Sequence, residues 1–126
     1  MKFRPLASVT FIALTLVACS SGSSGGGDTV PPGATLIRAQ QAITWDAKSY
    51  SATPVDGKVT ISLRDDSDLP HNLHLLDSDS VDKGISLNVE GLGDVHTDSV
   101  ALNPGTYKVI CTIPGHGNMQ AELIVG

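Results

Sequence analysis

Three side chains that can bind a soft metal ion lie within nine positions of one another near the C-terminal end of the sequence. The stretch CTIPGHGNM, from Cys111 to Met119, holds a thiol, the imidazole of His116 and a thioether. The whole chain has only two cysteines, two methionines and four histidines. A thiolate and two imidazoles in a trigonal arrangement, completed by a weak axial thioether, form the electron-transfer type of copper site. The stretch supplies three of these four groups, so a second histidine is needed.

The stretch PHNLH, Pro70–His74, offers two candidates for that histidine. Alternate side chains of a strand point to opposite faces. His71 is in phase with Leu73 and Leu75, whereas His74 lies on the other face. His71 is therefore the predicted ligand, and His74 is expected on the outer face.

The same alternation places the other candidate ligands. Cys111 is in phase with Val109, and Met119 is in phase with Leu123, so both should point inward at the two ends of one loop. His116 lies within that loop. One histidine from a distant strand and three ligands from one loop are thus predicted to converge at one end of the fold.

The elements that position these residues read as short strands between turn signals. The sequences VDG (55–57) and NPG (103–105) favour turns, because glycine accepts a positive φ and proline fixes its own φ. About seven strands at this spacing predict an all-β Greek-key sandwich. For residues 78–95, with three glycines, we expect a variable loop or a short helix. The predicted strands are Thr35–Gln41, Ala42–Trp45, Lys58–Leu63, His71–Leu76, Asp98–Leu102, Thr106–Cys111 and Met119–Val125.

The N-terminal part of the chain predicts export and a membrane anchor. Residues 1–19 have a basic start, an apolar run and small residues before Cys19. The apolar run is too short to span a membrane, and LVAC at its end resembles the lipobox of bacterial lipoproteins, which implies a lipidated Cys19. An ordinary secretory signal with an incidental cysteine is the alternative. Residues 20–33 are rich in serine and glycine and predict a flexible linker, which leaves residues 34–126 as one domain. The protein is expected to face the periplasm or the cell exterior.

The charge of the mature chain argues against a nucleic-acid partner. Removal of Lys2 and Arg4 with the signal leaves six of eight basic residues and all thirteen acidic ones, a formal charge of about −7. The acidic residues cluster at 64–68 and 77–82. These clusters are interpreted as solvated loops, with steering of a basic partner as the alternative.

The pair of motifs PHNLH and PGTYKVICTIPGHGNM resembles the cupredoxins, the small blue copper proteins that include plastocyanin, azurin and amicyanin. The resemblance implies one type 1 copper ion bound by His71, Cys111, His116 and Met119. It also implies that Asn72 hydrogen-bonds across to the segment that carries the cysteine. The spacing from Cys111 to His116 is azurin-like, and the spacing from His116 to Met119 is amicyanin-like.

The resulting hypothesis is a membrane-anchored, monomeric one-electron carrier that is not an enzyme. It would meet redox partner proteins, such as a cytochrome or an oxidoreductase, in transient contact near His116. The alternative within the same chemistry is a lipoprotein that delivers, stores or sequesters copper. Zinc also accepts a cysteine with two histidines, but methionine is a poor zinc ligand. A metal-free interaction module is the third possibility, and His96 is interpreted as a surface loop residue.

Overall fold

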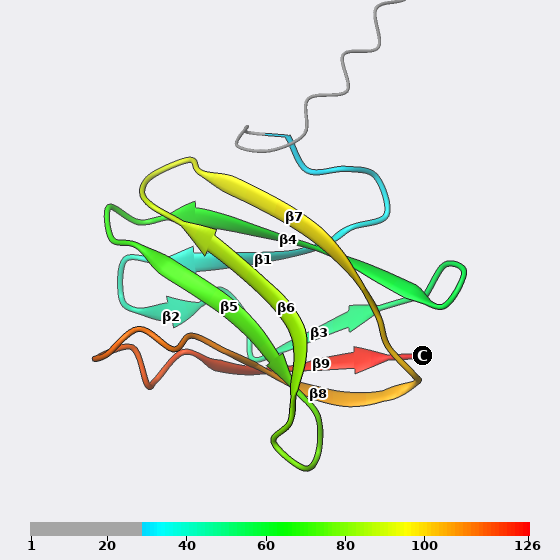
Figure 1. Cartoon of the computed structure of the whole chain (residues 1–126). Helices are drawn as coiled ribbons and strands as arrows, with labels where there is room; N and C mark the ends of the chain where they lie inside the picture. Colours follow the sequence, from blue (N-terminus) through cyan, green and yellow to red (C-terminus); the bar gives the residue numbers. More distant parts are fainter. Residues whose placement is uncertain (1–28) are drawn as a thin grey trace, which may run out of the picture.

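The computed structural model describes residues 29–126, which form a sandwich of two β-sheets (Figure 1). The signal segment, Cys19 and residues 20–28 of the linker lie outside the described residues. One sheet has the order β2-β1-β4-β7, and the other has the order β3-β9-β8-β5-β6. The strands are β1 (Thr35–Gln40), β2 (Thr44–Trp45), β3 (Ser49–Ala52), β4 (Lys58–Asp66), β5 (His71–Leu76), β6 (Asp82–Val89), β7 (Val95–Ala101), β8 (Gly105–Ile110) and β9 (Gln120–Val125).

The core between the sheets follows from the period-two pattern of the strands. In β5 the side chains alternate between buried and half-buried, and in β9 they alternate between exposed and buried. The apolar side chains that point inward from both sheets pack together in one cluster. Its fully buried members include Ile37, Ile61, Leu63, Leu73, Leu75, Val109 and Leu123. The prediction of an all-β sandwich is confirmed.

The expectation of a loop or short helix near 78–95 is wrong, because this region holds strand β6. Ile85, Leu87 and Val89 are buried, and the residues between them are exposed, so the segment has the alternation of a half-buried strand. Gly84 has a φ of +85°, beside the point where the β5–β6 register shifts. The glycines there belong to an irregularity at the strand end and to the following turn. They do not interrupt the strand.

The described residues therefore form nine strands rather than about seven. β3 is a four-residue strand that pairs in parallel with β9 and was not predicted. β4 continues three residues beyond the predicted end at Leu63. No helix in the described part of the chain is long and apolar enough to cross a membrane.

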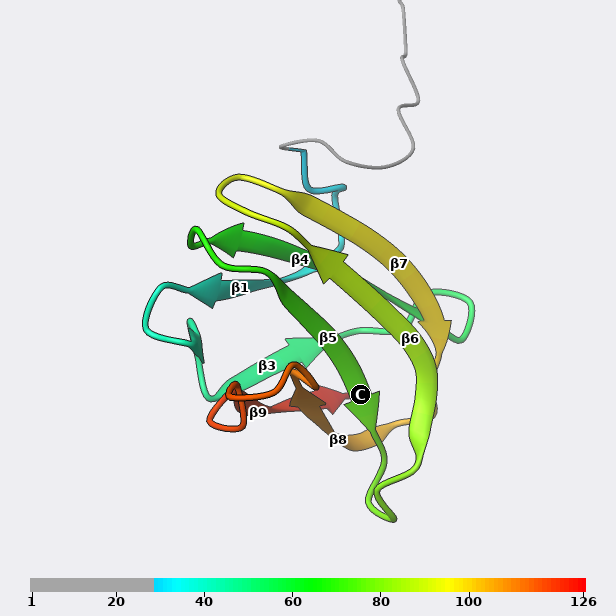
Figure 2. The same cartoon turned by 60° about the vertical axis from the view of Figure 1, so that its left-hand side comes forward.

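The segments that carry the predicted ligands lie at one end of the sandwich, and the chain enters β1 at the other. The antiparallel and parallel pairings bring the start of β5, the end of β8 and the loop before β9 to the same end (Figure 2). The chain enters β1 at Thr35, which pairs with Ile61, and leaves it at Gln40, which pairs with Asp66 close to the start of β5. The chain thus enters the domain at the end opposite to the predicted ligands (Figure 1).

Candidate metal centre

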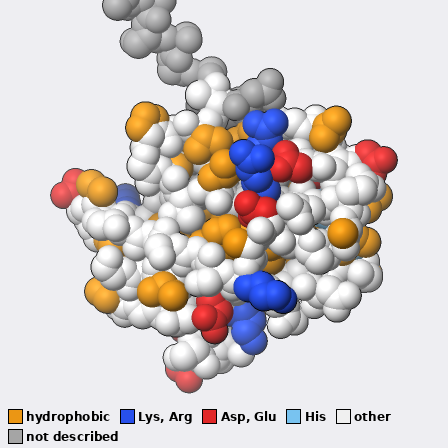
Figure 3. Space-filling view, turned by 180° about the vertical axis from the view of Figure 1, so that it is seen from behind, with side chains coloured by type: hydrophobic (Ala, Val, Ile, Leu, Met, Phe, Trp, Pro, Cys, Tyr) orange, Lys and Arg blue, Asp and Glu red, His pale blue; other side chains and the backbone are white. Residues whose placement is uncertain are grey.

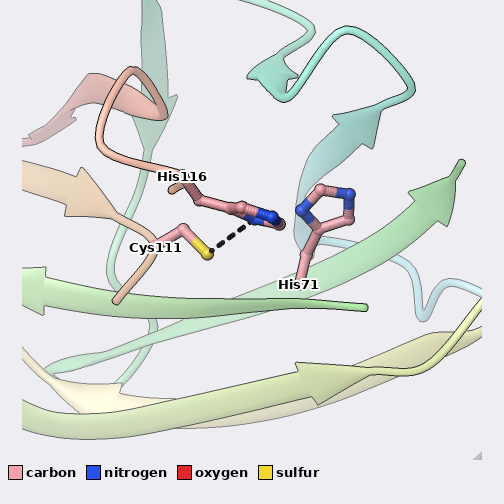
Figure 4. A group of neighbouring side chains, drawn as sticks. All are labelled: His71, Cys111 and His116. Carbon is pink, nitrogen blue, oxygen red and sulfur yellow. Dashed lines mark hydrogen bonds between the residues drawn. The ribbon is translucent and has the colours of Figure 1, made fainter. Parts of the chain in front are cut away.

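Three of the predicted ligands meet at one end of the sandwich (Figure 4). One ligand atom from each of His71, Cys111 and His116 lies within 4.8 Å of the others. The Cys111 Sγ atom is 3.7 Å from His116 Nδ1, and the two imidazole rings lie 4.9 Å apart between centroids. The three residues expose only 1%, 7% and 8% of their surface. A thiol and two imidazoles have thus been gathered in a space shielded from water.

The sheet places His71 and Cys111 beside each other. β5 and β8 are antiparallel neighbours, so the start of β5 lies next to the end of β8. Asn72 adds two hydrogen bonds across this junction: its amide nitrogen donates to Thr112 Oγ1, and its amide oxygen accepts from the Thr112 N–H, both at 2.8 Å. These bonds hold the residue after Cys111 against the residue after His71.

Tight turns in the loop between β8 and β9 place His116. The His116 N–H donates to the Ile113 carbonyl at 3.0 Å, and the Met119 N–H donates to the His116 carbonyl at 3.0 Å. Gly115 lies in the first of these turns with a φ of +88°, a conformation that side chains with a Cβ rarely adopt. The loop therefore folds back, and the imidazole of His116 faces Cys111.

Met119 lies immediately before β9 and is fully buried in the core cluster. Its inward orientation agrees with the alternation found in the sequence. Its role as an axial ligand stays a prediction.

The two nitrogens of His71 have different surroundings. Nε2 lies 2.8 Å from Ser67 Oγ. Nδ1 is buried and has no hydrogen-bond partner among the described residues. Burial lowers the pKa of His71, which outweighs the opposite effect of the Asp65 carboxylate, and the neighbouring His116 lowers it further. A neutral imidazole with an unpartnered, buried nitrogen is suited to bind a metal ion.

Comparison with known proteins supports the fold. No protein-family model matches the sequence, and no curated protein matches it. Among solved structures, a reduced tryptophan-to-tyrosine mutant of amicyanin has a TM-score of 0.59 at 17% identity, over 82% of this chain and 92% of that one. An oxidized proline-to-glycine mutant of amicyanin has a TM-score of 0.59 at 18% identity, over 86% and 97% of the two chains. Auracyanin A, a "blue" copper protein of Chloroflexus aurantiacus, has a TM-score of 0.58 at 22% identity, over 72% and 96%.

This chain has the cupredoxin fold. At these identities the similarity shows the fold alone.

The other two histidines lie outside the cluster. In this cupredoxin fold His74 Nδ1 is 3.0 Å from an Asp82 carboxylate oxygen, and His96 Nε2 is 3.3 Å from one of Asp94. Both are histidine–carboxylate pairs. Neither pair forms a potential metal-binding cluster with a third ligand among the described residues. Of the two histidines of PHNLH, His71 lies in the cluster with Cys111 and His116, and His74 does not.

Two residues at the site were missed by the sequence analysis. Asp65 and Ser67 are buried behind His71, although the acidic cluster 64–68 was interpreted as a solvated loop. The signal was present in the alternation of β4, because Asp65 is in phase with Ile61 and Leu63. A strand extended by two residues would have placed this carboxylate inside the cupredoxin fold.

Proposed function

We propose that this protein is a type 1 copper protein that carries one electron at a time between redox partners. The observation that carries the proposal is the convergence of the Cys111 thiol with two buried imidazoles, one of which presents a nitrogen that has no hydrogen-bond partner within residues 29–126. His71, Cys111 and His116 would hold the ion, with Met119 as the axial ligand. Bound copper would supply the Cu(II)/Cu(I) couple.

The donor set favours copper over zinc. Soft sulfur ligands suit Cu(I), and imidazoles suit copper in both of its oxidation states. Zinc commonly takes a fourth ligand from cysteine, histidine, a carboxylate or water. No carboxylate belongs to the cluster formed by the described residues, and the loop that carries Cys111 and His116 ends in Met119.

The protein's own contribution is a rigid and dry pocket. Strand pairing fixes His71, the Asn72–Thr112 bonds fix the segment after Cys111, and the turns around Gly115 fix His116. Because these side chains are held before any metal arrives, little rearrangement would accompany a change of charge at the site.

His116 is the proposed point of exit for the electron. Its ring is largely buried, but Gly115 and Gly117 on either side are exposed and lack side chains. A partner protein could therefore bring its own cofactor close to the ring. A carrier of this kind transforms no substrate, and its contacts with partners are small and transient.

We further propose that the domain works at a bacterial membrane, exported and tethered through lipid on Cys19. Support comes from the lipobox-like LVAC and from the linker composition. The entry of the chain opposite to the ligand end would leave His116 free to meet a partner.

The first test is a visible absorption spectrum of residues 28–126 after Cu(II) is added to the reduced, metal-free protein. We expect an intense charge-transfer band from the copper–thiolate bond in the unaltered domain, and no such band in Cys111→Ser. His71→Ala should weaken or abolish the band, whereas the matched control His74→Ala should retain it. A colourless protein, or colour that survives Cys111→Ser, would contradict the proposal. Copper binding with rapid exchange and no stable reduction cycle would favour copper delivery or storage instead.

A further inference from the structure

Behind His71 lies a chain of buried polar groups that ends in a carboxylate. Ser67 Oγ is 2.8 Å from His71 Nε2 and 2.7 Å from Asp65 Oδ1. Asp65 is fully buried, and its Oδ1 also accepts the backbone N–H of Ser67 at 2.9 Å. The three residues thus form a path from a carboxylate, through a hydroxyl, to the imidazole.

The neighbours of Ser67 decide which way the hydrogen bonds run. The hydroxyl has one hydrogen to donate and can accept two. Asp65 Oδ1, as a carboxylate oxygen, and the Leu69 carbonyl at 3.2 Å can only accept, whereas the Leu69 N–H at 3.1 Å can only donate. If the hydroxyl donated to His71, its oxygen would face the Asp65 oxygen at 2.7 Å with no hydrogen between them. The hydroxyl must therefore donate to Asp65 and accept from His71.

This direction fixes the tautomer of His71. Nε2 carries the proton and donates it to Ser67, so Nδ1 carries the free lone pair. Nδ1 is the buried ring nitrogen that has no hydrogen-bond partner in the described part of the chain, and its ring faces Cys111 and His116. The hydrogen-bond path behind the ring explains why that atom is ready to bind a metal ion.

We infer that Asp65 and Ser67 are positioning residues that hold His71 as the Nδ1-binding tautomer and bias the site toward the more positively charged metal ion. The inference rests on the proposed function for its metal part. A carboxylate one hydroxyl away from a ligand ring stabilises positive charge at the site more than a neutral group would. It should therefore strengthen binding of Cu(II) more than that of Cu(I).

The first experiment uses metal-free protein and separates this inference from the proposed function. Nitrogen-15 NMR of the histidine rings at slightly alkaline pH identifies which nitrogen of His71 is protonated. We expect the proton on Nε2 in the unaltered protein, and a mixture of tautomers in Ser67→Ala. A proton on Nδ1 in the unaltered protein would overturn the inference, whether or not the protein binds copper. An unchanged tautomer in Ser67→Ala would overturn it as well.

The second experiment measures copper binding by competition with a chelator, together with the reduction potential. Loss of the Ser67 hydroxyl should weaken Cu(II) binding by roughly 10–100-fold, the range found when partners behind ligand histidines are removed. Asp65→Asn keeps an oxygen that can accept from Ser67, so it should keep the tautomer and raise the potential. Each tenfold loss of Cu(II) affinity at constant Cu(I) affinity corresponds to a rise of about 59 mV.

Asp66→Asn is the matched control. It removes the same charge from the adjacent residue, which is partly exposed and pairs with Arg38 and Arg64 outside the hydrogen-bond path. We expect its copper affinity to equal that of the unaltered protein and its potential to change less than in Asp65→Asn. Backbone amide spectra establish that each variant is folded. Equal effects of the Asp65 and Asp66 substitutions would show that the path has no special role and would overturn the metal part of the inference.

Discussion

Asn72 connects the strand that carries His71 to the segment that carries Cys111. Both ends of its amide group bond to Thr112, so the side chain works as a clamp between residues forty positions apart. A donor and an acceptor are needed on one short side chain, which an asparagine supplies. Two consecutive residues of β5 thus lie at the contact with the segment after β8: His71 lies near Cys111, and Asn72 bonds to Thr112.

Asn72→Ala should lower the free energy of unfolding of the metal-free protein by about 1–2 kcal/mol, because two partly exposed hydrogen bonds are lost. Urea unfolding of the metal-free domain measures the change. Asn88→Ala is the control, since the Asn88 side chain is exposed and, among the described residues, makes only a 3.5 Å bond to Ser86. That substitution should cost less than about 0.5 kcal/mol. Equal costs for the two variants would contradict a clamping role for Asn72.

At the scale of the elements, β6 covers the side of β5 that would otherwise be an edge next to His71. It pairs antiparallel with β5, with Val89 opposite His71 and Leu87 opposite Leu73. An exposed edge would leave the backbone groups of β5 without partners and open to pairing with other chains. β6, which like β3 was not predicted, is thus one of the two strands that flank β5.

Leu87→Ala should destabilise the domain by about 2–5 kcal/mol, because it deletes a buried side chain and leaves a cavity against β5. Thermal or urea unfolding measures the loss. Ser86→Ala, one residue earlier on the exposed face of the same strand, should change stability by less than about 0.5 kcal/mol. If both substitutions had small effects, β6 would not be part of the core in solution.

Alternation predicted most of the fold and much of the cluster. The predictions were wrong where the type of residue was given more weight than the alternation. Alternation placed His71, Cys111 and Met119 inward because each shares a phase with neighbouring apolar side chains. β6 was missed because the number of glycines was given more weight than the clear alternation of Ile85, Leu87 and Val89. The burial of Asp65 was missed because its charge suggested exposure to solvent, even though its phase in the strand pointed inward. The hydrogen bonds that allow this burial come from Ser67, and sequence alone does not reveal them.

At the scale of the whole molecule, the candidate ligands join parts of the chain that are distant in sequence. His71 opens β5, and the other candidates lie between β8 and β9. On the face seen in Figure 3, basic and acidic side chains lie next to one another. Ion pairs such as Arg64–Asp66, at 2.9 Å, mix the two signs. A metal ion bound between the distant segments would act as a crosslink of the folded state.

Copper should therefore raise the stability of the folded domain. A ligand that binds only the folded state at 100 times its dissociation constant adds about 2.7 kcal/mol. Calorimetry with and without Cu(I) under reducing conditions measures the shift in melting temperature. Removal of the metal with a strong chelator should reverse it, and Cys111→Ser should reduce it sharply. A melting temperature that does not respond to copper would contradict binding at this site.

The place of β9 in its sheet has a consequence for the order in which the protein matures. β9 follows the other eight described strands in the sequence, yet it lies inside its sheet, between β3 and β8. Until it arrives, β3 has no hydrogen-bonded neighbour in that sheet, and the loop with His116 is anchored at one end only. In a chain that emerges N-terminus first, His71, Cys111 and His116 can therefore come together only after β9 has joined the sheet. Metal uptake would then be a late event, completed wherever the whole domain folds.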